Sequence, residues 1–113
     1  MAIFLVEKNY TKAFELYMKA AEAGSITGQC NLGYCYDVGR GVDKDHIKAV
    51  YWYEKSAEQG YARAQYRLAL CYYNGEGVSQ DYEKAVYWYT KAAEQNYADA
   101  HCNLGLCYEE GYG

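Results

Sequence analysis

Apolar and small residues recur along this chain at the spacing of a helix face. In one segment Ala49, Val50, Tyr53 and Ala57 follow one another at intervals of one, three and four residues, and similar spacing returns in the other segments. Such intervals place side chains on one side of a helix, whereas a half-buried strand would need strict alternation. The pattern predicts six helices and no strand. The expected helices are Tyr10 to Ala23, Thr27 to Val38, His46 to Gln59, Arg63 to Asn74, Tyr82 to Gln95 and Ala98 to Glu110.

The residues between these segments are typical of helix ends. Gly24, Gly60 and Asn96 each follow a predicted helix, and glycine and asparagine are the residues that most readily adopt a left-handed cap. Asp45 and Asp81 each precede a predicted helix, where a carboxylate accepts from the free N–H groups of the first turn. The predicted helices are therefore bounded by capping residues on both sides.

The whole pattern repeats every 36 residues. Asp81 to Gly113 matches Asp45 to Gly77 with 20 of 33 positions identical, and a weaker copy covers Asn9 to Gly41. A fixed period of this length indicates a stacked repeat array in which each unit is a pair of antiparallel helices. We call the first helix of each pair helix A and the second helix B. The chain is expected to form one array, made of a partial unit at 1–24, units at 25–60 and 61–96, and a partial unit at 97–113.

Composition excludes several classes of partner. The chain carries a net charge of −4 with a pI near 5.1, which argues against nucleic acid and anionic membrane surfaces, because both need a basic stripe. No apolar run approaches the roughly 20 residues that cross a bilayer. The apolar opening, Met1 to Val6, lacks a basic region and ends at Glu7 and Lys8, so no signal peptide is predicted.

The five cysteines are read as small apolar residues. Cys35, Cys71 and Cys107 share one repeat position, and Cys30 and Cys102 share another. Two residues five apart on a helix point about 140° away from each other, so the cysteines of one repeat do not converge on a metal. No metal or cofactor site is predicted. The subcellular location stays open, although unpaired cysteines and the lack of a signal peptide favour the cytoplasm over an oxidising compartment.

No catalytic arrangement emerges from the remaining polar residues. His46 occupies the position of Tyr82 in the next repeat, so packing at a helix start explains it, and His101 points away from its neighbour Cys102. A nucleophile needs a base within hydrogen-bond reach and a third group that orients the base. No such set is found, and the protein is not expected to be an enzyme.

Two glycine pairs, Gly39 with Gly41 and Gly75 with Gly77, lie in the loops after helix A. A dinucleotide-binding fingerprint needs a strand before the loop and a third glycine, and neither is present. We interpret the pairs as structural turns and expect at least one glycine of each pair to have a positive φ.

Nine of the 16 tyrosines form two informative groups. Residues that recur in phase are expected in the core: Tyr36, Tyr72 and Tyr108 on helix A, and Tyr17, Tyr53 and Tyr89 on helix B. Tyr34, Tyr66 and Tyr73 lie on another face of helix A at positions that change between repeats. Variable positions on a constant scaffold are suited to ligand specificity, although exposed aromatic residues are also common on plain solvated surfaces.

The repeat as a whole resembles a known family. One copy carries Ala64, Leu68, Tyr72, Gly75, Gly77, Val78, Asp81, Tyr82, Lys84, Ala85, Trp88, Tyr89, Lys91, Ala92 and Ala93, and another carries Leu32, Gly33, Tyr36, Gly39, Gly41 and Val42. This pattern resembles the Sel-one-like repeat, a branch of the tetratricopeptide-like helical repeats, over nearly the whole chain. Departures are Ala69 for a glycine, Asn96 for the final glycine and Leu16 for the tryptophan.

The resemblance implies an all-α, right-handed solenoid with helix A on the concave side, and a role as a protein-interaction scaffold or adaptor. Cysteine-rich bacterial relatives join each helix pair with a disulfide. Their cysteines fall at the positions of Ala93 and His101 here, so neither those disulfides nor the antibiotic-related activities suggested for that subfamily are carried over.

Alignment with the tetratricopeptide pattern places a defined set of residues in the concave groove. From this set we expect Tyr34, Asp37, Arg63, Tyr66, Leu70, Tyr73, Asn74, Asp99, Cys102, Leu106 and Glu109 to contact a protein or peptide partner, with Thr27, Cys30, Val38 and Glu110 beside them. Acidic residues at both ends, with Arg63 as the lone cation, favour a ligand of basic and apolar character. The alternatives are a structural spacer or oligomerisation module with an empty groove and, more remotely, a hydrolase related to the cysteine-rich subfamily.

The two ends of the array lead to a further expectation. The last predicted helix, Ala98 to Glu110, keeps the interior pattern of helix A without a following helix B, and Tyr10 to Ala23 lacks the helix A that precedes it elsewhere. A heterologous contact of this kind does not close on itself. Head-to-tail self-association is therefore expected.

Overall fold

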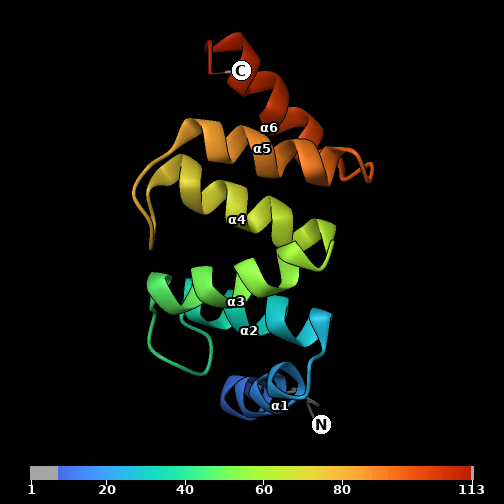
Figure 1. Ribbon diagram of the computed structural model, residues 1–113. Coiled ribbons are helices and arrows are strands. Elements are labelled where there is room, and N and C mark those ends of the chain that lie inside the picture. Colours follow the sequence, from blue (N-terminus) through green and yellow to red (C-terminus); the bar gives the residue numbers. More distant parts are fainter. Residues whose placement is uncertain (1–7, 113) are drawn as a thin grey trace, which may run out of the picture.

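The computed structural model describes residues 8–112, and within that range it contains six α-helices and no strand. The helices are α1 (Tyr10–Glu22), α2 (Ile26–Val38), α3 (His46–Glu58), α4 (Ala62–Asn74), α5 (Tyr82–Ala93) and α6 (Ala98–Glu109). They stack as a ladder from α1 to α6, with the two ends of the chain at opposite ends of the molecule (Figure 1). The predicted helix limits are correct to within two residues. The opening segment, for which no signal peptide is predicted, lies outside the described residues.

Capping side chains begin four of the helices. The side chains of Asp45 and Asp81 accept from the backbone N–H of the third helical residue, as predicted, and Asn9 and Ser25 do the same for α1 and α2. Each cap satisfies one of the N–H groups that the first helical turn leaves without a partner. The predicted left-handed residues Gly24, Gly60 and Asn96 all have positive φ.

Each helix packs mainly on the helices next to it in sequence. Tyr53 of α3 is completely buried, and its ring lies so close to Gly33 of α2 that a side chain at that position would collide with it. Leu32 of α2 and Leu68 of α4 are completely buried as well. Small residues on one helix and large rings on the other therefore allow close backbone approach inside each pair.

Three of the six in-phase tyrosines are buried as predicted, two are half-buried and one is exposed. Tyr36, Tyr53 and Tyr89 are buried, whereas Tyr17 and Tyr72 are half-buried. The prediction that Tyr108 is a core residue is wrong, because 58% of its surface is exposed. Its counterpart Tyr36 packs edge to face on Phe14 of α1, and no aromatic ring among residues 8–112 packs on Tyr108 in this way.

Two glutamine pairs, each made of one buried and one exposed residue, join the helices of a repeat. The Gln59 side chain donates to the side-chain oxygen of Gln29 (2.8 Å), and one repeat later Gln95 donates to Gln65 (3.0 Å). Gln65 in turn donates to the Ala57 carbonyl of the preceding helix B (3.2 Å). Gln29 likewise donates to the Ala21 carbonyl of the helix before it (3.5 Å). Because Gln29 and Gln65 are buried amides that need partners, their bonds help to fix one helix pair on the preceding one.

The loops after α2 and α4 contact the preceding repeat through a glycine. Gly41 lies against the backbone carbonyl of Tyr10, and Gly77 lies against that of His46, so closely that neither position has room for a Cβ atom. Both glycines also have a φ of +75°, which other residues rarely adopt. The glycine pairs are therefore structural turns that hold successive repeats together, and every glycine of the two pairs has positive φ.

Replacement of Gly77 by alanine should lower the free energy of unfolding by about 3 kcal/mol, because it combines a strained φ with a collision against the His46 carbonyl. Gly60 is the matched control. It also has a positive φ, but nothing lies within 4 Å of the Cβ that it would gain, so Gly60→Ala should cost only about 1 kcal/mol. Urea unfolding of both variants measures the difference, and equal costs would show that the loop contact adds nothing.

Candidate functional site

The A helices α2, α4 and α6 form one side of the array, which we call the helix-A face. Hydrogen bonds run across it between repeats. Arg63 of α4 donates to the Asn31 side chain of α2 (3.0 Å), and the Tyr73 hydroxyl of α4 donates to Glu110 at the end of α6 (3.0 Å). Two hollows lie along this face, one toward α1 and one toward α6.

The first hollow has a volume of about 340 Å³ and lies between α1, α2 and α4. Its lining combines aromatic rings with two guanidinium groups: Tyr10, Ala13, Tyr17, Asn31, Tyr34, Cys35, Arg40 and Arg63. The Tyr34 ring is the centre of a charged cluster, because the guanidinium carbons of Arg40, Arg63 and Arg67 lie 5.3, 5.6 and 4.8 Å from its centroid. We call Tyr34 and these three residues the arginine cluster.

Within residues 8–112 the arginine cluster forms no ion pair. Among residues 8–112 no carboxylate lies within 4.0 Å of any of the three guanidinium groups. The Nε atom of Arg67 is buried without a hydrogen-bond partner. The expectation that Arg63 is the lone cation of the groove is therefore wrong, since Arg40 from a loop and Arg67 from the next helical turn join it.

The second hollow is smaller and more apolar. It encloses about 150 Å³ between α4, α5 and α6, and it is lined by Leu70, Tyr73, Asn74, Tyr89, Asn103 and Leu106. Asn103 donates to the hydroxyl group of Tyr89 (3.1 Å), which holds the floor of the hollow in place. Leu106 remains 50% exposed at its edge. Four residues predicted for the groove, Leu70, Tyr73, Asn74 and Leu106, lie together here.

Other predicted groove residues have different surroundings. Cys30 is completely buried in the core, and Tyr66 is half-buried with its ring packed against those of Tyr89 and Tyr97. Tyr66 therefore supports the packing of α5 and α6 instead of lying free in the groove. Six further residues predicted for the groove are exposed but line neither hollow: Thr27, Val38, Asp99, Cys102, Glu109 and Glu110.

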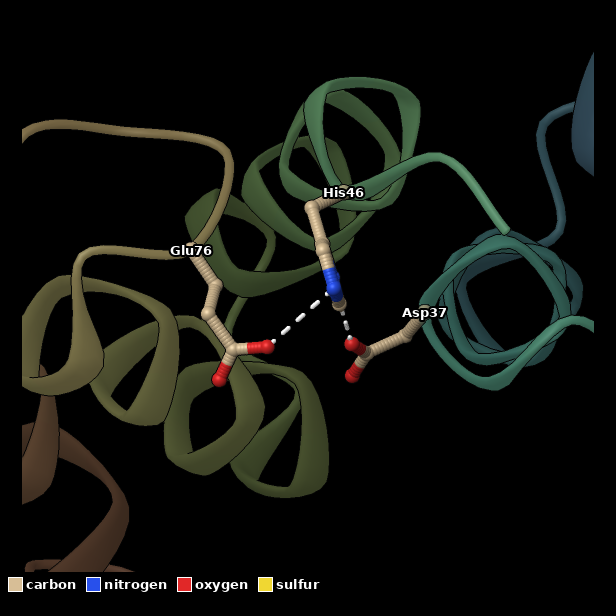
Figure 2. A group of neighbouring side chains, drawn as sticks. All are labelled: Asp37, His46 and Glu76. Atoms are coloured by element: carbon tan, nitrogen blue, oxygen red, sulfur yellow. Dashed lines mark hydrogen bonds and ion pairs between the residues drawn. The ribbon is translucent and has the colours of Figure 1, made fainter.

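Asp37 belongs to a separate polar cluster with His46 and Glu76 (Figure 2). The imidazole of His46 lies between the two carboxylates, with Nδ1 at 3.1 Å from Asp37 and Nε2 at 3.2 Å from Glu76. Asp37 also accepts from the Tyr53 hydroxyl (2.9 Å). Burial and then this carboxylate raise the pKa of Tyr53. His46 thus contacts two carboxylates, whereas the sequence predicted only packing at a helix start.

The cluster occupies the joint between two repeats. One period later, the three equivalent positions are Tyr73, Tyr82 and Tyr112, whose rings pack together, with Tyr82 and Tyr112 stacked at 3.9 Å. Glu110 accepts from Tyr73 and raises the pKa of that hydroxyl group to about 12. Equivalent joints are therefore filled by polar side chains in one repeat and by aromatic rings in the next.

Asp37, His46 and Glu76 are the residues that could hold a metal ion, because one ligand atom from each lies within 4.8 Å of the others. Both ring nitrogens of His46 face a carboxylate oxygen, so each is already in polar contact within the protein. Since uncharged rings close the equivalent joint without any ion, we interpret the cluster as a polar joint and assign no metal to it.

A larger hollow, of about 480 Å³, lies away from the helix-A face between α3 and α5. Tyr87, Trp88 and Lys91 line part of it, with the Tyr87 and Trp88 rings packed edge to face. Tyr51, Trp52 and Lys55 form the same arrangement one period earlier. Because the arrangement recurs in phase, we interpret it as part of the scaffold, and the helix-A face remains the candidate site.

Family comparison places the chain in a repeat family. The Sel1 repeat model matches residues 3–25, 26–61, 62–97 and 98–113, so the chain belongs to the Sel1 repeat family. Proteins built from this repeat are generally protein-interaction scaffolds, and the repeat is a non-catalytic fold. The predicted family and the predicted α-solenoid are confirmed. No curated protein sequence matches the chain.

Solved structures agree with this assignment. A Sel1 repeat protein from Oxalobacter formigenes is 41% identical with a TM-score of 0.87, over 96% of this chain and 44% of that one. The protective antigen c5321 of uropathogenic Escherichia coli, which has the SLR fold, is 40% identical with a TM-score of 0.91, over 94% and 23%. Cysteine-rich protein B of Helicobacter pylori is 32% identical with a TM-score of 0.77, over 86% and 72%. The chain thus spans less than half the length of the first two.

All five cysteines are free, and four of them are buried. Burial raises the pKa of Cys30 from 9.0 to about 11 and that of Cys71 to about 12. At neutral pH a rise of two units lowers the thiolate fraction roughly a hundredfold, and only the thiolate reacts with thiol reagents. Cys102 is the one exposed cysteine.

Native protein should therefore react with Ellman's reagent at one thiol in a fast phase and at the other four only after unfolding. Cys102→Ser should remove the fast phase, while Cys71→Ala should leave it unchanged. Fast reaction of Cys35, Cys71 or Cys107, or a disulfide between any two, would contradict their assignment to the core.

Proposed function

We propose that the protein binds an extended segment of a partner protein along the helix-A face, and so acts as an adaptor. The observation that carries this proposal is the pair of hollows on that face, which hold six of the predicted groove residues between them. One hollow offers aromatic rings and guanidinium groups, and the other offers leucine and tyrosine side chains. Such a combination suits a peptide that places alternate polar and apolar side chains into separate hollows.

The family assignment supports a binding role over a catalytic one, because Sel1 repeat proteins are generally interaction scaffolds. Aromatic and arginine side chains are enriched at protein interfaces, since they give large contact areas with few rotatable bonds. Tyr34 and Tyr73 are half-exposed at the two hollows, and Leu106 is exposed. These residues are available to a partner without unfolding of the array.

Selection of a random displayed-peptide library on the immobilised protein tests this proposal. Peptides that bind the helix-A face should lose about tenfold or more in affinity for Leu106→Arg, which places a charge in the second hollow. Ile47→Arg is the matched control, because Ile47 is an aliphatic helix residue that is 73% exposed outside both hollows.

Affinities should be measured at a protein concentration at which light scattering reports a monomer. Peptides that bind both variants equally would place the binding surface elsewhere. Failure to select any peptide would favour the alternative of a structural spacer.

Self-association is a second proposal, supported by the exposed apolar surface of α6. Tyr108 is 58% exposed and Leu104 is half-buried, whereas their counterparts Tyr36 and Leu32 in α2 are buried. On α1, Phe14 and Tyr17 are half-buried on a helix that packs mainly on α2. Packing of α6 from one molecule on α1 of the next would cover both surfaces and continue the array.

Light scattering over a wide concentration range should show a mass that rises with concentration, because a head-to-tail contact does not close. Leu104→Glu should abolish this rise and Ile47→Glu should leave it unchanged. A monomer at every concentration would exclude the contact.

A further inference from the structure

All three arginines of this chain converge on one tyrosine. The guanidinium carbons of Arg40, Arg63 and Arg67 lie within 5.6 Å of the Tyr34 ring centroid. We propose that the arginine cluster is a carboxylate-binding site that recognises aspartate and glutamate side chains of an acidic segment in the partner protein. This inference rests on the proposed function, and it names the chemistry that the first hollow selects.

The arginine cluster does not recur one period later, unlike the lysine–tyrosine contacts. Lys48 over Tyr36 recurs one period later as Lys84 over Tyr72, so these contacts belong to the scaffold. The positions equivalent to Arg40, Arg63 and Arg67 hold Glu76, Asp99 and Asn103 in the next repeat. The convergence of three arginines therefore is not a by-product of the repeat, and it needs its own explanation.

Hydrogen-bonding capacity in the cluster is largely unused. A guanidinium group carries five N–H donors and pairs with carboxylates through two parallel hydrogen bonds. Within the described chain, only Arg63 donates to another side chain, Asn31, which fixes the orientation of its guanidinium group. Arg67 keeps a buried Nε without an acceptor. The Tyr34 ring attracts all three cations through its face and leaves their N–H edges free for an anion.

Charge repulsion also favours an anionic ligand. Three cations gathered around one ring repel one another, and water screens this repulsion less at the half-buried Arg63 and Arg67 than at the exposed Arg40. Asp37 forms no ion pair with these guanidinium groups, and its polar partners are His46 and Tyr53. One or two carboxylates in the adjacent hollow of about 340 Å³ would remove the repulsion.

A protein segment fits this surface better than a nucleic acid does. The other end of the helix-A face carries the exposed carboxylates Asp99, Glu109 and Glu110, and the whole chain has a charge of −4. A continuous polyanion would be repelled there. A peptide with acidic residues toward α2 and apolar or basic residues toward α6 would meet complementary groups at both ends. The charge distribution therefore also sets the direction in which the peptide lies.

The three arginine side chains give a direct measurement. In a ¹⁵N-correlated NMR spectrum the chain has three arginine Nε–Hε signals, one for each member of the cluster. Titration with an acetylated and amidated tetraglutamate peptide should shift these signals in a saturable manner. The corresponding tetraglutamine peptide should leave them unchanged. Inorganic phosphate at the same concentration, and a single-stranded oligothymidylate, should bind more weakly than the glutamate peptide.

Two charge-neutralising variants and a matched control complete the test. Arg40→Gln, at an exposed position, and Arg63→Gln should each weaken tetraglutamate binding about tenfold or more. Lys48→Gln removes the same charge from a cation–aromatic contact outside the cluster, and should leave the affinity nearly unchanged. Thermal unfolding of each variant shows whether the fold is intact, and Arg63→Lys separates charge from the planar geometry of the guanidinium group.

The inference is overturned if the glutamate peptide leaves the three signals unshifted, or if phosphate or oligothymidylate binds more tightly than it does. It is also overturned if Lys48→Gln and Arg40→Gln lose the same amount of affinity for the glutamate peptide. Failure here is distinguishable from failure of the proposed function. Library peptides that depend on Leu106 but not on the arginines would keep the helix-A face as a binding surface and remove only its carboxylate preference.

Discussion

The contact between a glycine loop and the preceding helix B determines how each repeat sits on the one before it. Gly41 and Gly77 allow the loop backbone to approach the first carbonyl of α1 and α3, and no other residue would fit at that distance. Since the loops follow α2 and α4, this contact also fixes the directions of the A helices. The helix-A face, its two hollows and the joint at His46 all depend on this approach of two backbones.

The same approach explains how residues from different repeats meet. Arg40 and Glu76 each precede a contact glycine, so their side chains are carried to the start of the preceding helix B. There Arg40 lies 5.1 Å from the Tyr10 ring centroid, and Glu76 pairs with His46. A constant backbone geometry thus presents one variable side chain per repeat at an equivalent place. Repeat proteins acquire different surfaces on one scaffold in this way.

The features that recur in phase could be predicted from the sequence, because each is dictated by contacts inside the repeating unit. The buried residues expected on α3, including Ala49, Val50 and Tyr53, are all buried. The capping role of Asp45 and Asp81 was predictable for the same reason, since a cap bonds only to its own helix. Tyr108 was misassigned because its burial depends on a neighbouring element and not on its own helix.

The candidate site was only partly predictable, because its chemistry does not follow the period. Arg40, Arg63 and Arg67 are separated by 23 and 4 residues, and nothing in that spacing shows that they share one ring. The packing of Tyr66 on Tyr97 is likewise a contact between a helix and a later turn. One available signal was overlooked: the chain has only three arginines, and all of them lie within two successive repeats.

The Tyr–Trp pairs on the opposite surface also make the array optically readable. Trp52 and Trp88 are the only two tryptophans, they occupy equivalent positions, and each packs edge to face on the tyrosine before it. Their indole groups therefore start from nearly the same environment in two successive repeats. In the single-tryptophan variants Trp52→Phe and Trp88→Phe, the remaining indole reports when its own repeat loses structure. The molecule carries one tryptophan in each full unit, so the cooperativity between adjacent units is measurable without an added label.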